Sequence, residues 1–506
     1  MIDRLFIALA LALAFFIQNV GAAESSEIRV AAPWEISGPD PSTDGFVFLR
    51  MGVLETLVST SESGNLQPGL AENWSTTSDG LTWRFTLREA TFHDGTPLTS
   101  DAAVTALQRA VSNPGPLGKV AIDSIEADGR DVLIKLTSPF LPLPAVLSHS
   151  STVIPAPSSF DPNGKVLSAI GTGAFRVNEL KPPQSLTTAR FDGYWGEKAE
   201  MASASYLAVK RAETRALMAE SGDADIVFTL DPAGFKNLKS VDSLKAVSVA
   251  IPRVMLIKVN AGHSMLGDET VREALSLAVD REGIAAGITR YPEAAATQTF
   301  PPGLGDWHNA ELPALAYDPQ RAKSLLAKAG WSAGEDGILV RDGKRFSLTM
   351  RTFPDRPELP LVAAAIQDQW REIGIELNVS VANYSEIPKG HQDGSLEVAL
   401  FARNYGSIPD PYGSVLSDFG AGGGDWGSMN WDNPEVVAAL GKIANTDDES
   451  VRTSLIKEIG KAIHTDLPMI PVVWYQHTVA YKKGLEDIVI DPLERSYGLN
   501  LVNWAQ

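Results

Sequence analysis

Residues 400–413 gather the side chains of this sequence that are best suited to binding a small charged molecule. An apolar run predicts a strand, and a loop with arginine, aspartate and tyrosine follows it. Arg403 could clamp a carboxylate through two parallel hydrogen bonds, and Asp410 could hold an ammonium group. Tyr405 and Tyr412 could stack on a ligand or donate a hydrogen bond to it. A purely structural alternative for Asp410 is to cap a turn in this loop.

The sequence lacks the patterns of common catalytic and metal centres. It contains no cysteine, which excludes disulfides, thiolate catalysis and cysteine-ligated metals. It contains no Walker loop, no Gly-x-Ser-x-Gly elbow and no His-Glu-x-x-His motif. The seven histidines are scattered without ligand spacing and are His93, His149, His263, His308, His391, His464 and His477. We therefore expect no catalytic residue, no metal site formed by the chain alone and no cofactor.

Composition predicts a large globular protein with more than one lobe. The chain has 506 residues, of which 44% are hydrophobic and 21% charged. This length exceeds what one hydrophobic core usually serves, so two or three lobes are expected. The net charge of −19 argues against nucleic acid as a partner, because polyanions bind basic surfaces.

Residues 1–23 have the pattern of a secretory signal peptide. Arg4 supplies a positive charge, residues 5–17 are apolar, and residues 20–23 offer small side chains for cleavage. The alternative is a transmembrane anchor, but this apolar run is shorter than the ~20 residues that span a bilayer. Because no cysteine is available for lipid attachment, we expect a diffusible periplasmic protein.

Strands and helices alternate along the rest of the chain, as in α/β proteins. Strands are expected at residues 28–33, 132–136, 254–260, 348–352, 375–381 and 469–474. Helices are expected at residues 102–111, 214–221, 269–281, 319–329 and 360–373, as a pair within 434–465, and as a helix end at 52–58. Asp318 should cap the helix that starts at Pro319. The strand, helix and strand between residues 348 and 381 predict a parallel βαβ unit, and the strand at 469–474 should cross back toward the first lobe.

Residues 81–101 combine an alternating strand, a turn and a capped helix. Trp83, Phe85 and Leu87 share one face of the strand and are read as core. The neighbouring His93 and Asp94 are read as parts of the turn rather than as a catalytic pair. The helix that follows is expected to be capped by the residue pair Ser100 and Asp101, one of which serves as N-cap.

Several separated motifs resemble one family in the same order along the chain. They are the Trp83 to Gly95 block, residues 171–175, Tyr194-Trp195, Arg215 with Gly222-Asp223, Val271-Arg272 with Asp280-Arg281, and Tyr317-Asp318-Pro319 with Ala329-Gly330-Trp331. Together they resemble the extracytoplasmic solute-binding proteins of ABC importers, family 5, the peptide- and nickel-binding type. The resemblance implies an α/β, two-lobed periplasmic-binding-protein fold of type II, similar to cluster C, with an extra subdomain in the first lobe.

The resemblance also implies a domain organisation in which the ligand lies between the lobes. The lobe I core is expected at residues 24–45, 166–252 and 476–506. The inserted subdomain is expected at 46–165 and lobe II at 253–475. In this family the region of residues 400–413 contacts ligand, and the Pro-rich segment with His149 lies near the cleft. The residues expected to bind ligand are Arg403, Tyr405, Asp410, Tyr412, His149, Phe46 and Tyr497.

Two departures from the family pattern bear on the ligand. Peptide-binding relatives carry an aspartate a few residues before the Asp410-Pro pair, whereas this chain has none at residues 405–409. Nickel-binding relatives use an arginine in the stretch that matches residues 147–154, but no arginine occurs between Arg130 and Arg176. The usual anchor for a chelate carboxylate is therefore absent or replaced, and His149 is the candidate replacement.

We expect a periplasmic solute-binding protein that is monomeric and is not an enzyme. It would capture a small peptide-like or nickel-type chelate solute and deliver it to ABC permease subunits in the inner membrane. A secreted hydrolase of peptides or esters is one alternative, which would need a clustered nucleophile and base. A periplasmic chaperone that binds extended peptides is another. Ligand-dependent closure without turnover would distinguish the importer component from the hydrolase.

Overall fold

The computed structural model describes residues 26–61, 64–113, 115–354, 356, 358–406, 408–444, 446 and 448–505. The predicted signal peptide, residues 1–23, lies outside this described part. Within the described residues, no helix has both the length and the apolar character needed to cross a membrane.

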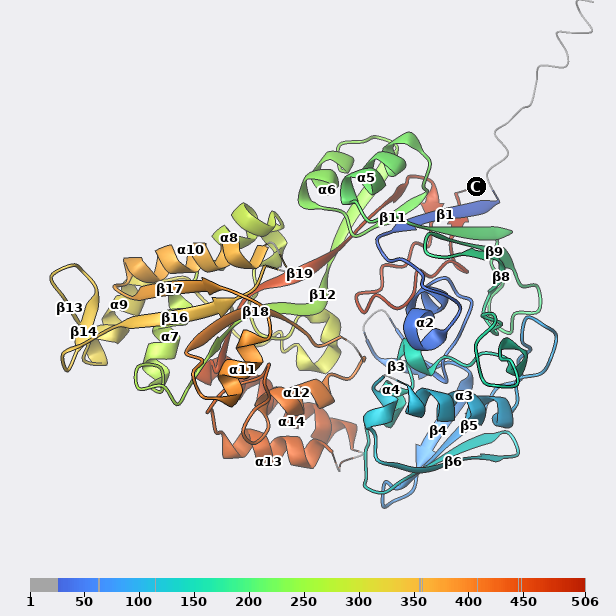
Figure 1. Cartoon of the computed structure of the whole chain (residues 1–506), viewed down its shortest axis with the longest axis horizontal. Helices are drawn as coiled ribbons and strands as arrows, with labels where there is room; N and C mark the ends of the chain where they lie inside the picture. The colour runs from blue at the N-terminus through green and yellow to red at the C-terminus, as the bar shows by residue number, and fades with distance from the viewer. Residues whose placement is uncertain are drawn as a thin grey trace, which may run out of the picture.

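One ten-stranded sheet runs through both lobes (Figure 1). In spatial order its strands are β17 (Glu376–Val381), β16 (Ser347–Thr352), β18 (Val398–Asn404), β12 (Leu244–Val259), β19 (Met469–Lys482), β11 (Ile226–Phe228), β1 (Glu27–Ala32), β10 (Ser203–Ala208), β9 (Ser185–Arg190) and β8 (Phe175–Lys181). The long strands β12 and β19 pair antiparallel and pass from one lobe to the other. This strand pair is therefore the connection about which the lobes can rotate.

Lobe I covers its part of the sheet with helices on both faces (Figure 1). The helices are α2 (Pro41–Arg50), α5 (Ala212–Ser221) and α6 (Pro232–Leu238). In β11, Ile226 and Phe228 belong to the core beneath α2, whereas Val227 belongs to the core beneath α5 and α6. This alternation places α2 on one face of the shared sheet and α6 on the opposite face.

A subdomain with its own core extends from lobe I. Its sheet has the order β4 (Ala71–Thr76), β5 (Thr82–Leu87), β7 (Asp131–Leu136) and β6 (Ile122–Asp128), and α3 (Ser100–Ser112) packs on it. The predicted core positions Trp83, Phe85 and Leu87 are all buried on β5, which confirms the strand and its face. The cap is Thr99, one residue earlier than predicted, because its side chain accepts a hydrogen bond from the Ala102 N–H.

Lobe II is built around a core drawn from residues 254–474. Its helices are α7 (Glu269–Leu277), α8 (Arg281–Ile284), α9 (Pro319–Lys328), α10 (Glu358–Glu372), α11 (Glu386–Gln392), α12 (Tyr412–Phe419), α13 (Pro434–Ile443) and α14 (Glu449–Asp466). The strands β16 and β17 pair parallel on either side of α10 in sequence, which confirms the predicted βαβ unit. The Asp318 side chain caps α9 at the Arg321 N–H, also as predicted. The strand expected at residues 469–474 extends as β19 into lobe I.

The remaining elements are short. The short strands are β2 (Val58–Thr60), β3 (Leu66–Pro68), β13 (Ser332–Ala333), β14 (Leu339–Arg341), β15 (Lys344–Arg345), β20 (Leu485–Glu486) and β21 (Asn503–Trp504). The short helices are η1 (Leu117–Lys119), α4 (Leu143–Val146), η2 (Ser150–Thr152), η3 (Pro157–Ser159), η4 (Ala285–Thr289), η5 (Pro292–Ala294) and η6 (Pro302–Trp307).

Two helix predictions were wrong in their limits. Residues 52–58 are not a helix end, because α2 stops at Arg50 and Gly52 adopts a left-handed φ of 64° that turns the chain toward β2. The helix expected at 269–281 is two helices. The Asp280 side chain accepts the Gly283 N–H and so starts α8 separately from α7.

Candidate ligand-binding site

A cavity of about 430 Å³ lies between the two lobes, and we call it the interlobe cavity. From lobe I it is lined by Pro33, Trp34, Phe46, Leu49, Arg50, His149, Ser150, Thr229, Leu493, Glu494 and Arg495. From the connecting strand and lobe II it is lined by Arg253, Asn404 and Gly406. Its volume is in the range of small-molecule sites, and its walls are rich in arginine.

Arg50 is held at this cavity by α2. Asp40 caps the helix, and Phe46 and Arg50 are four residues apart on α2, so they share one face. The Arg50 guanidinium carbon lies 4.0 Å from the Trp34 ring centroid and 5.3 Å from that of Phe46. Its Nε donates to the backbone oxygen of Glu494 at 2.5 Å. Its Nη1 is buried and has no hydrogen-bond partner among the described residues.

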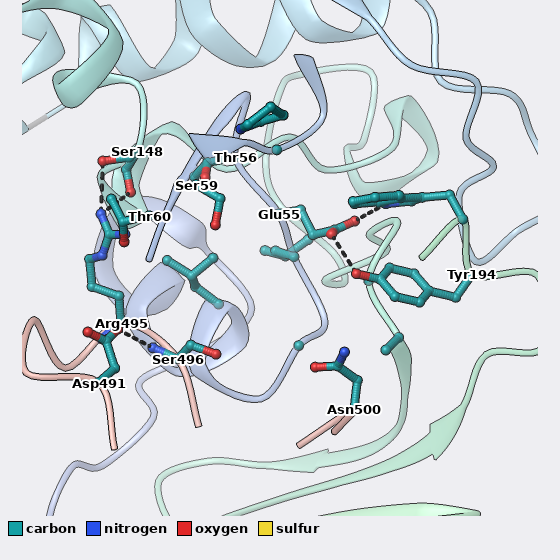
Figure 2. Close-up of a pocket in the computed structure, with 18 residues that line it drawn as sticks. Glu55, Thr56, Ser59, Thr60, Ser148, Tyr194, Asp491, Arg495, Ser496 and Asn500 are labelled. Atoms are coloured by element: carbon teal, nitrogen blue, oxygen red, sulfur yellow. Dashed lines mark hydrogen bonds between the residues drawn. The ribbon is translucent and has the colours of Figure 1, made fainter. Parts of the chain in front are cut away.

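Arg495 enters the cavity from the C-terminal segment. Its Nη1 donates to the Ser148 hydroxyl at 2.9 Å, a contact visible in Figure 2. Its backbone N–H donates to the Asp491 carboxylate at 2.8 Å, which fixes the start of the side chain. Burial lowers the pKa of Arg495 to about 10. The Nε of Arg495 is buried and unpartnered within the described part of the chain.

His149 lies beside Arg495 and is uncharged at neutral pH. Its Nδ1 accepts the Ser151 N–H at 3.1 Å. Burial, and then the positive charge of Arg495, lower the pKa of His149 to about 4. A neutral ring offers no charge to a carboxylate, whereas the adjacent Arg495 brings a guanidinium to this place.

Arg253 reaches the cavity from β12, where it pairs with Asn404 of β18. Burial lowers the pKa of Arg253, and the carboxylate of Glu494 opposes that shift. No hydrogen bond or ion pair reaches the Arg253 guanidinium from any residue that the structure describes. The lining therefore contains three guanidinium charges and one carboxylate, a balance of +2 in a chain whose net charge is −19. The cavity is suited to an anion.

Arg403 and Tyr405 turn toward a buried aspartate of their own lobe. Arg403 forms a bidentate ion pair with Asp418, with Nε to Oδ2 at 2.7 Å and Nη2 to Oδ1 at 2.8 Å. The buried Tyr405 hydroxyl donates to the same Oδ2 at 2.9 Å. Burial, and then the charge of Asp418, raises the pKa of Tyr405 well above its usual value.

The other predicted ligand residues lie in lobe II, in the lobe I core or at the cavity. Asp410 pairs with Arg452 and accepts the Tyr412 N–H at 3.0 Å, the turn-forming arrangement considered for it. The buried Tyr412 hydroxyl donates to the Leu440 carbonyl oxygen at 3.0 Å. Tyr497 is buried and stacks on the Phe228 ring at a centroid distance of 4.2 Å. Of the seven residues expected at the site, Phe46 and His149 are among the described lining residues, and the roles of all seven in binding stay predictions.

The three cavity arginines were missed by sequence reasoning. The sequence did contain a signal for Arg50. It lies four residues after the predicted ligand residue Phe46, so a helix places both on one face. A signal also existed for Arg253, because it interrupts an otherwise apolar strand, and a charge there needs a partner or a ligand. No local pattern in the sequence pointed to Arg495, because it is 346 residues from its spatial neighbour His149. Among the described residues, no cluster of three or more His, Asp or Glu side chains could hold a metal ion.

The fold and cavity define a class of protein before any comparison. Two α/β lobes that share a pair of crossing strands and enclose a polar cavity are the architecture of a periplasmic-type binding protein. The chain belongs to the bacterial extracellular solute-binding proteins of family 5, whose middle-region model matches residues 65–426. This result confirms the resemblance read from the motifs.

Individual relatives agree with that assignment. The chain is 28% identical to the nickel-binding periplasmic protein of Escherichia coli K12, over 96% of this chain and 95% of that protein. It is 24% identical to the dipeptide-binding protein of the same strain, over 89% and 88% of the two chains. The crystal structure of a nickel ABC transporter protein from Bacillus halodurans superposes with a TM-score of 0.84 at 24% identity, over 94% of this chain and 99% of that one. The two-lobed type II fold is thereby confirmed.

Proposed function

We propose that this protein captures a small anionic solute, of the carboxylate-bearing metal-chelate type, in the interlobe cavity and delivers it to an ABC permease. The observation that carries the proposal is the surplus of guanidinium groups around the cavity. Arg50 and Arg495 each keep a buried, unpartnered nitrogen, and Arg253 has no polar partner among the described residues. A buried cation without a counter-charge is costly, so an anionic ligand between the lobes would be strongly favoured.

A chelate fits these groups better than a zwitterionic peptide does. A peptide amine needs a free carboxylate, but Asp418 is taken by Arg403 and Tyr405, and Asp410 is paired with Arg452. The described lining offers only the Glu494 carboxylate. The metal would arrive inside its chelator, because the described residues hold no ligand cluster of their own. The nickel-binding name of the relative that is 28% identical supports the same choice.

The remaining parts of the proposal follow from the family. The protein would be exported through cleavage of residues 1–23, act in the periplasm as a monomer and close around its solute without chemical turnover. A hydrolase or a chaperone is less well supported, because the matched relatives are named as binding proteins.

The test is calorimetric titration of the mature chain with nickel complexes that differ in charge. Anionic nickel–citrate should bind at least tenfold more tightly than the neutral bis-histidine complex of nickel, and free Ni²⁺ and Ala-Ala should bind weakly. Native mass spectrometry of protein purified from its own periplasm should show a retained anionic solute. Equal affinity for free Ni²⁺, or preference for Ala-Ala, would overturn the proposal.

A further inference from the structure

We propose that a second cavity behind Arg495 is a subsite for an uncharged, hydroxyl- or amide-bearing arm of the ligand. This inference rests on the proposed function, because it places the anionic group of the same ligand in the interlobe cavity. The solute would then be an extended molecule with an anionic head in the interlobe cavity and a neutral polar arm in the second cavity.

The second cavity adjoins the first. It has a volume of about 220 Å³, lies where the lobe I core meets the subdomain, and is called the inner cavity here (Figure 2). Leu49 and Arg495 line both cavities, so the two cavities meet at these side chains. A carboxylate bound by Arg495 from the interlobe side would have the inner cavity directly behind it.

The first of two buried carboxylates at the inner cavity is fully engaged by the protein. Glu55 accepts hydrogen bonds from the Thr172 hydroxyl at 2.7 Å, the Trp195 indole at 3.0 Å and the Tyr194 hydroxyl at 3.2 Å. Figure 2 shows its carboxylate turned toward these aromatic side chains. Burial raises the pKa of Glu55. Glu55 is therefore poorly placed to hold a cationic arm.

The second carboxylate is engaged as well. Asp491 accepts the backbone N–H groups of Leu493 and Arg495 at 2.8 Å each, and that of Ser496 at 3.0 Å. These bonds shape the turn that carries Arg495 between the cavities. Asp491 is thus committed to the backbone and not to a ligand.

The polar groups left to a ligand are neutral. Ser59 and Asn500 line the inner cavity, and no hydrogen bond to either side chain comes from the described residues. In Figure 2 the two side chains stand on different sides of the cavity, away from the bonds made by Glu55 and Arg495. A hydroxyl and an amide can each donate and accept, so together they suit hydroxyl or amide groups on a ligand. Ser59 is exposed and Asn500 half-buried, so a charged arm would lose part of its hydration here without gaining a free counter-charge.

The experiment uses three six-carbon acids that share the carboxylate and differ in the arm. Gluconate has a neutral hydroxylated arm, hexanoate an apolar one, and 6-aminohexanoate a cationic one. Calorimetric titration should give at least tenfold tighter binding of gluconate than of either other acid. Ser59→Trp, which fills the inner cavity, should abolish this preference. Thr105→Trp, on the exposed face of α3 and outside both cavities, should leave it unchanged.

A second variant should reduce the preference for gluconate. Ser59→Asp adds the free carboxylate that the inner cavity lacks, so the ratio of gluconate to 6-aminohexanoate affinity should fall at least tenfold. Equal binding of the three acids by the wild type, or a preference that survives Ser59→Trp, would overturn the subsite. Binding of nickel–citrate without binding of any six-carbon acid would overturn the subsite alone. Failure of nickel–citrate and all three acids to bind would overturn the proposed function with it.

Discussion

The hydroxyl of Tyr291, in lobe II, donates a hydrogen bond to the backbone oxygen of Leu230, in lobe I, at 3.3 Å. The Tyr291 ring also lies 5.8 Å from that of Phe235 on α6. It packs against both the lobe II core and the lobe I core beneath α5 and α6. This second core lies on the face of the shared sheet opposite to α2 and the interlobe cavity. Tyr291 therefore joins the two lobes on the side of β12 and β19 that is opposite to the interlobe cavity. We call this interaction the rear contact.

Removing this rear contact should favour closure. Rotation that closes the cavity on one side of β12 and β19 must open the contact on the other side, so Tyr291 opposes closure. Tyr291→Ala should increase affinity for an anionic solute by roughly tenfold or more, because it removes the ring packing as well as a hydrogen bond that is itself worth roughly threefold to tenfold. Because the chain has no cysteine, dyes can be attached at Thr105→Cys and Lys461→Cys to follow the lobes by energy transfer.

Tyr291→Phe is the matched control, because it removes the hydroxyl and keeps the ring. It should show a smaller shift in the same direction. Unchanged dye distance and affinity in both variants would show that the rear contact does not influence closure.

The ion pair of Arg403 with Asp418 should be important for stability. Asp418 is 1% exposed, and without Arg403 the Tyr405 hydroxyl is the one hydrogen-bond donor to its carboxylate among the described residues. Arg403→Ala should lower the free energy of unfolding by about 3 kcal/mol, measured by urea denaturation. The double variant Arg403→Met with Asp418→Leu should recover most of that loss.

The same Arg403→Ala protein also tests the ligand role expected from the sequence. If Arg403 binds the solute directly, affinity measured well below the unfolding transition should fall by roughly 1.5 to 3 kcal/mol. If its role is only to neutralise Asp418, affinity should stay within about twofold of the wild type. The double variant separates the two roles, because it restores stability and still lacks the guanidinium.

Local signals predicted elements well but could not assemble the site. The Asp318 cap and the alternation of Trp83, Phe85 and Leu87 depend on neighbours within a few residues, and both were predicted correctly. The interlobe cavity depends instead on sheet order, which brings Arg50, Arg253 and Arg495 together from distant segments. Periodicity and motif spacing contain no information about such distances. The resemblance to a family predicted the two lobes, but the motifs that carried it did not include these three arginines.

Arg253→Met should weaken anion binding without weakening the fold. The substitution removes a half-buried charge that has no hydrogen bond or ion pair from the described residues, and the methionine retains much of the apolar stem. Affinity for nickel–citrate should fall by roughly tenfold or more, whereas the unfolding midpoint in the absence of ligand should stay the same or rise. Parallel calorimetry and thermal unfolding would check this. A lower midpoint with unchanged affinity would assign Arg253 a structural role.

Lys258 should make the stability of lobe II depend on pH. Its Nζ is buried, lies 2.6 Å from His391 Nδ1 and donates to the Asp425 carbonyl oxygen at 2.9 Å. Burial lowers the pKa of Lys258 to about 7, although the charges of Asp418 and Asp425 oppose the shift. The unfolded chain keeps a lysine pKa near ~10.4 and so binds more protons than the folded chain between those two values. The contribution of Lys258 to stability should therefore rise from pH 7 to about pH 10. Urea denaturation at pH 6.5, 8 and 9.5 should show this rise relative to Lys258→Met, and parallel pH profiles for the two proteins would contradict it.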